Sequence, residues 1–511
     1  MNKNRQIISE LKDFFRHNDS SKAVNAVNKE MGKLVIQAKT VGPVKNPNCK
    51  FTFVQLVRLL VLYPFFSVKT PADYADSALG KLFSCKKDTF YRLMDDGRID
   101  WRRLVHSINR QLIGLISRRA DAKDATRCLI LDDTDLPKRG NRAEGLGKVF
   151  SHTAMKCILG FKAMFLCYTD GKTQLMVDAT IQAETGKDAS KPQGLTKKQK
   201  AAQYSKERNE EEKINTRKEE MFQSKIANAI KMIRRAIIEG IRFDYLLVDS
   251  WFPCAELLQF IHSRHLKCHL IGMIKMGKTK YETALGDLCA RDIIKRLEKA
   301  KATKRNRSIG YTCASIKAKY AGMDVQLFFY KKGNGSWNAL ITTDMGIDAK
   351  RAFELYARRW CIEVAHKEMK GLLNLGKCQC VDFAGQVAAL SLCMIQYNIL
   401  GTVKRFESYE TIGGLFAEIT GETVELTVVQ RIWGLIIEVI NVIAEFLSCD
   451  PFELTENVIN NNHQIKAVKM AFDRLDLAGA RCIHRDTPEE RPDGPYPATS
   501  TVQDHGLEPP L

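Results

Sequence analysis

Two short apolar runs that both end in aspartate constrain the fold of this chain more than any other feature. The first is Cys128–Leu131, followed by Asp132 and Asp133, and the second is Tyr245–Val248, followed by Asp249. Apolar runs of this length, bounded by polar residues, are typical of strands that are buried in a sheet. Acids at the carboxyl ends of such strands lie where α/β proteins usually place their functional sites.

The elements predicted around these runs follow an alternating order. Two β-rich segments, Phe161–Tyr168 and Gln174–Gln182, are separated by the turn signal at 169–172. Further helices and strands are predicted at Ile226–Glu239, Cys254–Arg264, His269–Ile274, Asn338–Thr343 and Lys350–Leu373. This order predicts an α/β fold with a mixed sheet. The charged segment Glu184–Phe222 is expected to be a solvated loop and an exposed helix.

The acids of the first run differ in the direction in which they point. Alternate residues of a strand share a face, so Asp133 is expected to share one with Leu129 and Leu131. Asp132 is expected to point the other way. Burial of an ionised carboxylate is costly unless a metal ion or a partner compensates it. A single aspartate could instead be a helix N-cap or a turn residue, but two strands that end in this way favour a functional site at Asp133 and Asp249.

A third acid, Glu363, lies on the predicted helix Lys350–Leu373. At about 100° per residue, a helix places Tyr356, Arg359, Glu363 and Lys370 within about 60° of one another. These four side chains therefore form one stripe. The alternative is an exposed helix face on which Glu363 forms an ion pair with a basic neighbour such as Arg359.

Two aspartates and one glutamate supply hard oxygen ligands, which suit Mg²⁺ or Mn²⁺ and no thiol-seeking metal. Three carboxylates can hold two such ions, one activating the attacking water or 3′-hydroxyl and the other stabilising the leaving oxygen of a phosphoryl transfer. Arg359 and Lys370 would then contact flanking phosphates. This pattern predicts Asp133, Asp249 and Glu363 as metal ligands and catalytic residues.

The formal net charge of +20 favours a polyanionic partner, because each cation placed on a phosphate releases condensed counterions. A ribosome-associated or merely basic soluble protein is the alternative. Residues 78–94 are typical of a helix-turn-helix, in which Lys87 and Arg92 of the second helix could reach DNA. A plain helical hairpin fits this segment equally well. Two amphipathic helices, Asn2–His17 and Ser20–Lys33, are predicted before it.

The composition argues against a membrane protein and against a zinc protein. The apolar run Leu56–Phe66 is too short to span a bilayer, and the apolar region around Leu426–Leu447 contains charged residues. The fifteen cysteines lack paired spacing, so reduced cytosolic thiols are expected. No secretory signal is recognisable at the start, and we expect a cytoplasmic protein.

The stripe has a known counterpart. Its spacing Y-x2-R-x3-E-x6-K over Tyr356–Lys370 resembles the Y-R-E-K signature of insertion-sequence-four-type DDE transposases, the group that includes the transposon-five enzyme. The segment Leu131–Gly140 looks like the first-aspartate motif of that group, with Asp133 in the ligand position. The segment Leu247–Leu257 resembles the second-aspartate motif and assigns Asp249.

The resemblance implies an RNase H-like catalytic domain with a β-rich insertion, and two Mg²⁺ ions for which Mn²⁺ can substitute. It implies double-stranded DNA as partner, both as transposon ends with terminal inverted repeats and as target. It also implies a homodimer in the synaptic complex, hydrolytic nicking and strand transfer, in the cytoplasm and nucleoid of a bacterium. Tyr356, Arg359 and Lys370 would contact DNA phosphates near the cleaved end.

The domain organisation follows from the same elements. We expect a helical DNA-binding domain (1–124), an RNase H-like catalytic domain in two parts (125–274 and 336–405), a β-rich insertion (275–335), a C-terminal helical region (406–482) and a disordered tail (483–511). One alternative function is that of an RNase H-like nuclease without strand transfer. Another is that of a catalytically inactive DNA-binding protein.

Two assignments keep an alternative of their own. The first-aspartate motif contains three acids, and strand alternation and motif position favour Asp133 over Asp132 and Asp135. The tryptophans nearest these elements are Trp251, Trp337 and Trp360. Each could stack on an extruded base, but core packing is the expected role.

Overall fold

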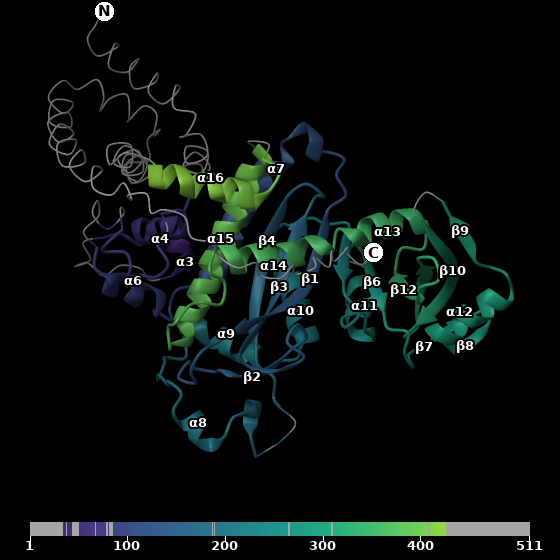
Figure 1. Ribbon diagram of the computed structural model, residues 1–511, viewed down its shortest axis with the longest axis horizontal. Helices are drawn as coiled ribbons and strands as arrows, with labels where there is room; N and C mark the ends of the chain where they lie inside the picture. Colours follow the sequence, from purple (N-terminus) through teal and green to yellow (C-terminus); the bar gives the residue numbers. More distant parts are fainter. Residues whose placement is uncertain are drawn as a thin grey trace, which may run out of the picture.

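Figure 1 shows the computed structural model of the chain. It describes residues 34–425 apart from 37, 43–50, 67, 78–79, 81–84, 187, 189, 264–265, 308–309 and 407–408. Several expectations lie outside the described residues: the helices Asn2–His17 and Ser20–Lys33, nearly all of the first helix of the expected helix-turn-helix, most of the region 406–482, and the tail 483–511.

The centre of the protein is a mixed sheet. Its first six strands are β1 (Cys128–Pro137), β2 (Gly147–Ser151), β3 (Lys156–Thr169), β4 (Gln174–Gln182), β5 (Tyr245–Val248) and β6 (His269–Ile274). β3 pairs antiparallel with β1 and β4, whereas β5 pairs parallel with β1 and β6 parallel with β5. The resulting order β4-β3-β1-β5-β6 is that of an RNase H-like fold, which confirms the predicted fold class.

The two apolar runs end at the same level of the sheet. β1 and β5 pair in parallel from Cys128↔Tyr245 to Leu131↔Val248. Beyond Leu131, β1 continues to Pro137 beside β3, with Asp132 opposite Phe165. The acids that were expected to follow the first strand therefore lie in the middle of a longer one, at the point where β5 leaves its side.

Residues 275–335 extend this sheet, as the predicted β-rich insertion requires. They form β7 (Lys280–Thr283), β8 (Gly286–Cys289), α12 (Ala290–Lys299), β9 (Lys304–Asn306), β10 (Tyr311–Tyr320) and β11 (Met323–Lys331). β12 (Asn338–Thr342) pairs with β11 on one side and with β6 on the other, and so joins the two halves of the sheet. Figure 1 shows the added strands and α12 as a lobe at one end of the protein. The domain boundaries themselves stay a prediction.

The helices pack against the sheet or against one another. They are α3 (Ala38–Val41), α4 (Phe53–Leu62), α6 (Lys87–Met94), α7 (Trp101–Ser117), α8 (Lys197–Ala201), α9 (Lys213–Met221), α10 (Lys225–Ile238), α11 (Ala255–His262), α13 (Ala349–Ala357), α14 (Trp360–Leu372), α15 (Phe383–Phe406) and α16 (Ile412–Glu425), with 3-10 turns at Tyr63–Phe66, Ala120–Ala122 and Pro192–Gly194. α10 begins where Ser224 Oγ accepts the Ala227 N–H at 3.1 Å, which fixes Lys225 at its first turn.

α15 is the central helix of the core. Its Asn398 side chain donates to Asn109 Oδ1 of α7 at 2.7 Å and to the Met176 carbonyl of β4 at 2.9 Å. By length and composition α15 could also cross a membrane, but 94% of its most apolar window is buried inside the protein. A helix that is apolar on all sides is also typical of the core of a large protein, and the contacts of α15 fit that role.

A buried ion network attaches α7, α9 and α10 to β4. Asp178 of β4, 1% exposed, accepts from Arg102 Nε at 2.9 Å and from Arg235 Nε at 2.7 Å. Glu220, 2% exposed, accepts from both arginines. Burial would raise the pKa of Asp178, but Arg102 and Arg235 hold it well below its usual value. Glu220 and the buried Arg217 belong to Glu184–Phe222, so the expectation of a solvated segment is wrong there.

Candidate active site

Asp132 and Asp249 are brought together by the parallel register of β1 and β5. Leu131 and Val248 form the last register pair, and the two aspartates follow at equivalent positions. Residues at equivalent positions of neighbouring strands point to the same side of a sheet. Asp249 is held in place after the strand ends, because the Trp251 N–H donates to Asp249 Oδ1 at 2.9 Å.

The environment of Asp132 opposes its negative charge. Its side chain is 17% exposed. Burial raises the pKa of Asp132 to about 7, against the effect of Arg359 and with the support of the neighbouring acids Asp249 and Asp133. Neighbouring carboxylates raise one another's pKa unless a cation lies between them. The site at the end of β5 is therefore a place where a cation would be stabilised.

Arg359 links Glu363 to these acids. Arg359 Nη2 donates to Glu363 Oε1 at 2.5 Å, and Nη1 lies 3.8 Å from Asp132 Oδ2. Burial would lower the pKa of Arg359, but Tyr356 and Glu363 raise it. One guanidinium thus lies between two carboxylates that come from distant parts of the chain.

The helix expected over Lys350–Leu373 is divided into α13 and α14. The residues between them keep right-handed helical angles, with φ −55° and ψ −33° at Arg359, but their hydrogen bonds join residues three apart instead of four. Tyr356, Arg359 and Glu363 still lie on one side of the helix despite these shorter hydrogen-bond intervals. Arg359 lies 5.9 Å from the centroid of the Tyr356 ring on one side and contacts Glu363 on the other.

Tyr356 is buried next to Arg359. It is 6% exposed, and its hydroxyl oxygen forms no hydrogen bond of normal geometry within the described residues. Burial raises its pKa to about 12, although Arg359 opposes this, and Asp249 raises it further. Because the hydroxyl is buried, a contact with a DNA phosphate would require a rearrangement, and that contact stays a prediction.

Asp133 points to the opposite side of β1. Its carboxylate contacts Lys225 Nζ of α10 at 2.5 Å and lies 3.6 Å from Lys162 Nζ of β3. Lys162, 3% exposed, also contacts Asp135 at 3.1 Å. The alternation along the strand is as predicted, but the face that meets Arg359 is that of Asp132. The structure thus replaces Asp133 by Asp132 as the aspartate of β1 that lies with Asp249.

Lys370, the last member of the stripe, is directed at β1. Its Nζ donates to Thr134 Oγ1 at 2.6 Å. Burial lowers the pKa of Lys370, while Asp135 raises it. Seven residues of helix separate it from Glu363 by about 10 Å, so Lys370 lies beside the site and outside the group formed by Arg359 and the acids.

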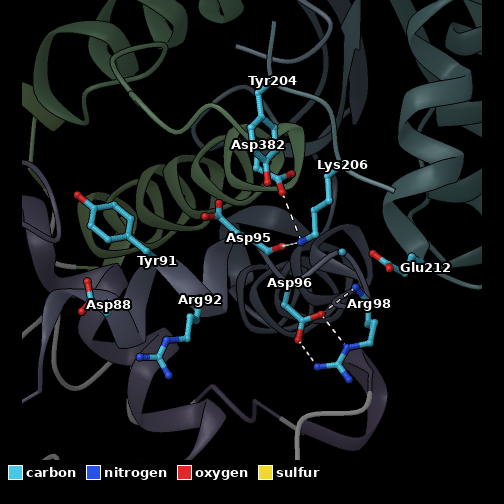
Figure 2. A pocket seen from close by; sticks show the side chains of 11 residues that line it. Asp88, Tyr91, Arg92, Asp95, Asp96, Arg98, Tyr204, Lys206, Glu212 and Asp382 are labelled. Atoms are coloured by element: carbon cyan, nitrogen blue, oxygen red, sulfur yellow. Dashed lines mark hydrogen bonds and ion pairs between the residues drawn. The ribbon is translucent and has the colours of Figure 1, made fainter. Parts of the chain in front are cut away.

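Lys87 and Arg92 lie elsewhere. Both are exposed on α6, which confirms the predicted second helix over Asp88–Met94, but Figure 1 shows α6 at the opposite end of the protein from α13. Arg92 lines a hollow, seen in Figure 2, whose other charged residues are Asp88, Asp95, Asp96, Arg98, Lys206, Glu212 and Asp382. Acids outnumber bases there, so the hollow does not favour phosphate. A DNA contact of Lys87 and Arg92 stays a prediction.

The donor set suits a divalent cation. Asp132, Asp249 and Glu363 offer carboxylate oxygens, the ligands that Mg²⁺ prefers, and the Tyr356 hydroxyl is buried near Asp132 and Asp249. Among the described residues, no three His, Cys, Asp or Glu side chains are already placed to share a metal ion. Glu363 is instead held by Arg359. A metal ion would be held by Asp132, Asp249 and Glu363 once Glu363 exchanges Arg359 for it.

The fold and the site define the class of protein. It is an RNase H-like α/β protein in which Asp132 and Asp249 lie where β1 and β5 part. Residues 75–283 match the family model described as "DDE superfamily endonuclease". The matched segment contains Asp132 and Asp249 and ends before Glu363. No curated protein matches the chain.

One solved structure shows a distant likeness. It is described as "Cryo-EM structure of piggyBac transposase synaptic complex with hairpin DNA (SNHP)". The sequences are 13% identical, with 81% of this chain and 80% of that chain covered and a TM-score of 0.40. A likeness of this size carries no argument about fold or function.

The sequence did not predict the position of Asp132 or the exposure of two tryptophans. Asp132 could have been found by aligning the last apolar residues of the two runs, Leu131 and Val248, as neighbours in a parallel sheet. Trp251 and Trp360 were expected in the core but are 48% and 38% exposed. Lys225 Nζ lies 5.1 Å from the centroid of the Trp251 ring.

Proposed function

We propose that this protein is a metal-dependent DNA transposase that cuts and rejoins phosphodiester bonds at the ends of a mobile element. The observation that carries the proposal is that Asp132 lies beside Asp249 where β1 and β5 part, while Arg359 links Asp132 to Glu363. The match of residues 75–283 to DDE superfamily endonucleases supports the nuclease part. The net charge of +20 supports a nucleic-acid partner.

The three carboxylates would hold one or two Mg²⁺ ions, for which Mn²⁺ can substitute, and these would supply charge stabilisation and an activated water or 3′-hydroxyl. The side chains of the chain do the rest. Asp132 must be ionised to act as a ligand, and a nearby dication favours that form. Once free of Glu363, Arg359 can donate two parallel hydrogen bonds to a phosphate beside the cleaved bond.

Other groups around the acids would hold the DNA strand. Lys370 would contact a phosphate farther along the strand, as a point charge. The exposed ring of Trp251 lies next to Asp249, and a base could stack on it. Lys225, which lies over that ring, would add a positive charge on the side opposite Arg359.

The finer parts of the proposal rest on the spacing of Tyr356, Arg359, Glu363 and Lys370. They are membership of the insertion-sequence-four type, recognition of terminal inverted repeats, strand transfer into target DNA and a homodimer in the synaptic complex. A bacterial, cytoplasmic location near the nucleoid goes with them. Each is proposed here together with the activity.

A cleavage assay tests the proposal. The purified protein is supplied with Mg²⁺ and two duplexes, one carrying the element's own ends and one with those ends scrambled. A transposase gives nicks and joined products on the first duplex alone. A nuclease without strand transfer cuts both and joins neither, and an inactive DNA-binding protein shifts the DNA and leaves it intact. Either of the last two results would overturn the proposal.

Two variants on α14 make the assay specific for the site. Glu363→Gln keeps the size of the side chain and removes its charge, so cleavage should be abolished while DNA binding is retained. Lys367→Gln changes an exposed residue one turn further along the same helix and should cut like the natural protein. Normal cutting by Glu363→Gln would show that the site has been assigned wrongly.

A further inference from the structure

Half of the net charge of the protein lies in the insertion. Residues 275–335 contain fifteen Lys and Arg residues and five Asp and Glu residues, a net charge of +10 out of +20 for the whole chain. Within the insertion, the charge is densest in residues 291–307, which contain eight basic and two acidic residues. We call residues 291–307 the basic segment.

The structure turns these charges outward. The basic segment consists of most of α12 and of β9 with the turns beside them. α12 buries Ile293, Ile294 and Leu297 against the sheet of the lobe. Its other side exposes Arg291, Lys295, Arg296 and Lys299. Arg291, Lys295 and Lys299 follow one another at four-residue intervals, so they form a row with steps of about 6 Å along the helix.

The row continues beyond the helix. Lys301, Lys304, Arg305 and Arg307 are exposed in the residues that lead from α12 through β9. β9 is fixed to β10 by the register pairs Lys304↔Cys313 and Arg305↔Thr312. Helix and strand are thus both anchored to β10 and its neighbours, and the cations are carried by a rigid surface.

Little of this charge is compensated within the protein. Of the two acids in the basic segment, Glu298 is engaged by Lys331 at 3.1 Å and by Trp337 Nε1 at 2.9 Å, both outside the segment. Asp292 accepts from the Cys289 thiol at 3.0 Å. None of the eight exposed cations of the segment forms an ion pair with a carboxylate of the described residues, although Arg291 and Arg296 donate to the backbone carbonyls of Met276 and Leu285.

The composition of the segment selects the kind of polyanion. Single-stranded nucleic acid is usually bound by cations combined with aromatic rings on which bases stack. The basic segment contains no Phe, Tyr or Trp. Cations without aromatic residues fit the phosphate backbone of a duplex, which is bound through charge and without regard to sequence.

We propose that the basic segment is a surface that binds the backbone of duplex DNA without sequence preference and without metal. It would hold DNA at a place that Figure 1 shows at the far end of the protein from α6. That the duplex is transposon or target DNA rests on the proposed function. The electrostatic surface does not, because it requires none of the three carboxylates.

The test compares two triple variants of the full-length protein. Lys295→Gln, Lys299→Gln and Lys304→Gln together remove three exposed cations from the basic segment. Lys197→Gln, Lys198→Gln and Lys213→Gln remove three exposed cations from α8 and α9, outside the insertion, and serve as the matched control. Thermal melting of both variants within about 2 °C of the natural protein, a difference of the order expected for about 1 kcal/mol, verifies that the fold is intact.

Binding is measured with a short duplex of unrelated sequence, in EDTA, over a range of about 50 to 200 mM salt. The insertion variant should bind at least tenfold more weakly at low salt, and its plot of log Kobs against log salt should be shallower by about 2 to 3, since each lost phosphate contact removes about 0.9. The control variant should keep the natural slope. Equal slopes for the two variants would overturn the proposal.

Further probes separate this inference from the proposed function. Single-stranded DNA, duplex RNA and vesicles of anionic lipid should each lose less affinity than duplex DNA in the insertion variant. A larger loss with any of them would show that the partner is wrong. Asp132→Asn should bind the unrelated duplex normally. If Asp132→Asn still cleaves DNA, the proposed catalytic site is wrong, but the proposed DNA-binding surface is unaffected. If instead the insertion variant and the control variant bind DNA alike, the proposed surface is wrong, but the catalytic site is unaffected.

Discussion

Arg359 holds Glu363 by a 2.5 Å hydrogen bond from Nη2. Through Nη1 the same guanidinium lies 3.8 Å from Asp132. A single positive charge of the protein is therefore shared by two of the carboxylates that would otherwise be free to bind a divalent ion. Metal ion and guanidinium compete for the same oxygens, and the outcome of that competition can be measured.

Removal of this internal cation is expected to strengthen metal binding. Arg359→Met keeps much of the length and apolar bulk of the side chain and removes its charge. Because Glu363 no longer needs to exchange a partner, Mg²⁺ should bind about threefold to tenfold more tightly, which corresponds to about 0.7–1.4 kcal/mol. Isothermal titration calorimetry measures this, with Arg359→Lys as the charge-preserving control. Weaker binding by Arg359→Met would mean that Arg359 positions the acids and does not compete for them.

The two neighbouring aspartates of β1 should differ in their effect on stability. Asp133→Asn removes a partner of Lys162, which is 3% exposed. An uncompensated buried cation is costly, although Asp135 remains near, so we expect a loss of about 1–2 kcal/mol in the free energy of unfolding. Asp132→Asn removes a carboxylate that burial disfavours and should leave stability unchanged or raise it at pH 8. Urea unfolding measures the free energy of unfolding of both variants. A less stable Asp132→Asn than Asp133→Asn would contradict the prediction.

The ion network around Asp178 should be essential to the fold. Asp178→Asn removes the buried partner of Arg102 and Arg235 and leaves them with one remaining acid, and breaking a buried ion pair in this way costs about 3–5 kcal/mol. Asp287→Asn breaks an exposed pair with Lys280 and should cost less than about 1 kcal/mol. Chemical denaturation of the two variants gives the comparison. Similar values for both would show that the network contributes no more than a surface pair.

The hollow in Figure 2 should give a pH-dependent signature of opposite sign at two adjacent residues. Burial, and then Asp382, raises the pKa of Asp95 to about 6 in the folded protein. The folded state therefore binds more protons than the unfolded state between about pH 4 and 6, and Asp95 costs stability increasingly as the pH rises through that window. Asp95→Asn should accordingly gain about 1–2 kcal/mol relative to the natural protein between pH 4.5 and pH 7.

Asp96 is the matched control. Although burial acts to raise it, the pKa of Asp96 is lowered by hydrogen bonds from Arg98. A lowered acid pKa stabilises the folded state above the unfolded pKa, and this contribution is lost as the pH falls. Asp96→Asn should therefore be less stable than the natural protein by a nearly constant amount from pH 4.5 to 7, and the difference should shrink as the pH falls below about 4. Parallel pH profiles for the two variants would contradict the assignment.

The sheet was predictable because its strands are locally encoded. Buried runs such as Leu246–Val248 and Ala339–Ile341 are apolar and bounded by polar or turn residues, and they lie in the expected strands. The length of β1 was not predictable in this way. Its second half, from Asp132 to Pro137, is polar and is held by pairing with β3, which local periodicity does not reveal. The burial of Arg217 and Glu220 in the charged segment Glu184–Phe222 was not predictable for a similar reason, since their partners are distant in sequence.

The part of the site that lies on one helix was predictable from helical spacing. Tyr356, Arg359 and Glu363 share one side because the backbone stays helical across the junction of α13 and α14. Which aspartate joins them depends on the register between β1 and β5, and two strands so far apart in sequence do not encode their register locally. Alternation within β1 separates Asp132 from Asp133 but cannot tell which face meets the helix.

The most direct test of the central claim is electron paramagnetic resonance of Mn²⁺ bound to three variants in the absence of DNA. Asp132→Asn and Asp249→Asn should each lose the bound Mn²⁺ signal, because both acids lie at the end of the same parallel pairing. Asp133→Asn, whose carboxylate is held by Lys225 and Lys162, should bind Mn²⁺ like the natural protein. Loss of the signal in Asp133→Asn, together with its survival in Asp132→Asn, would contradict the account.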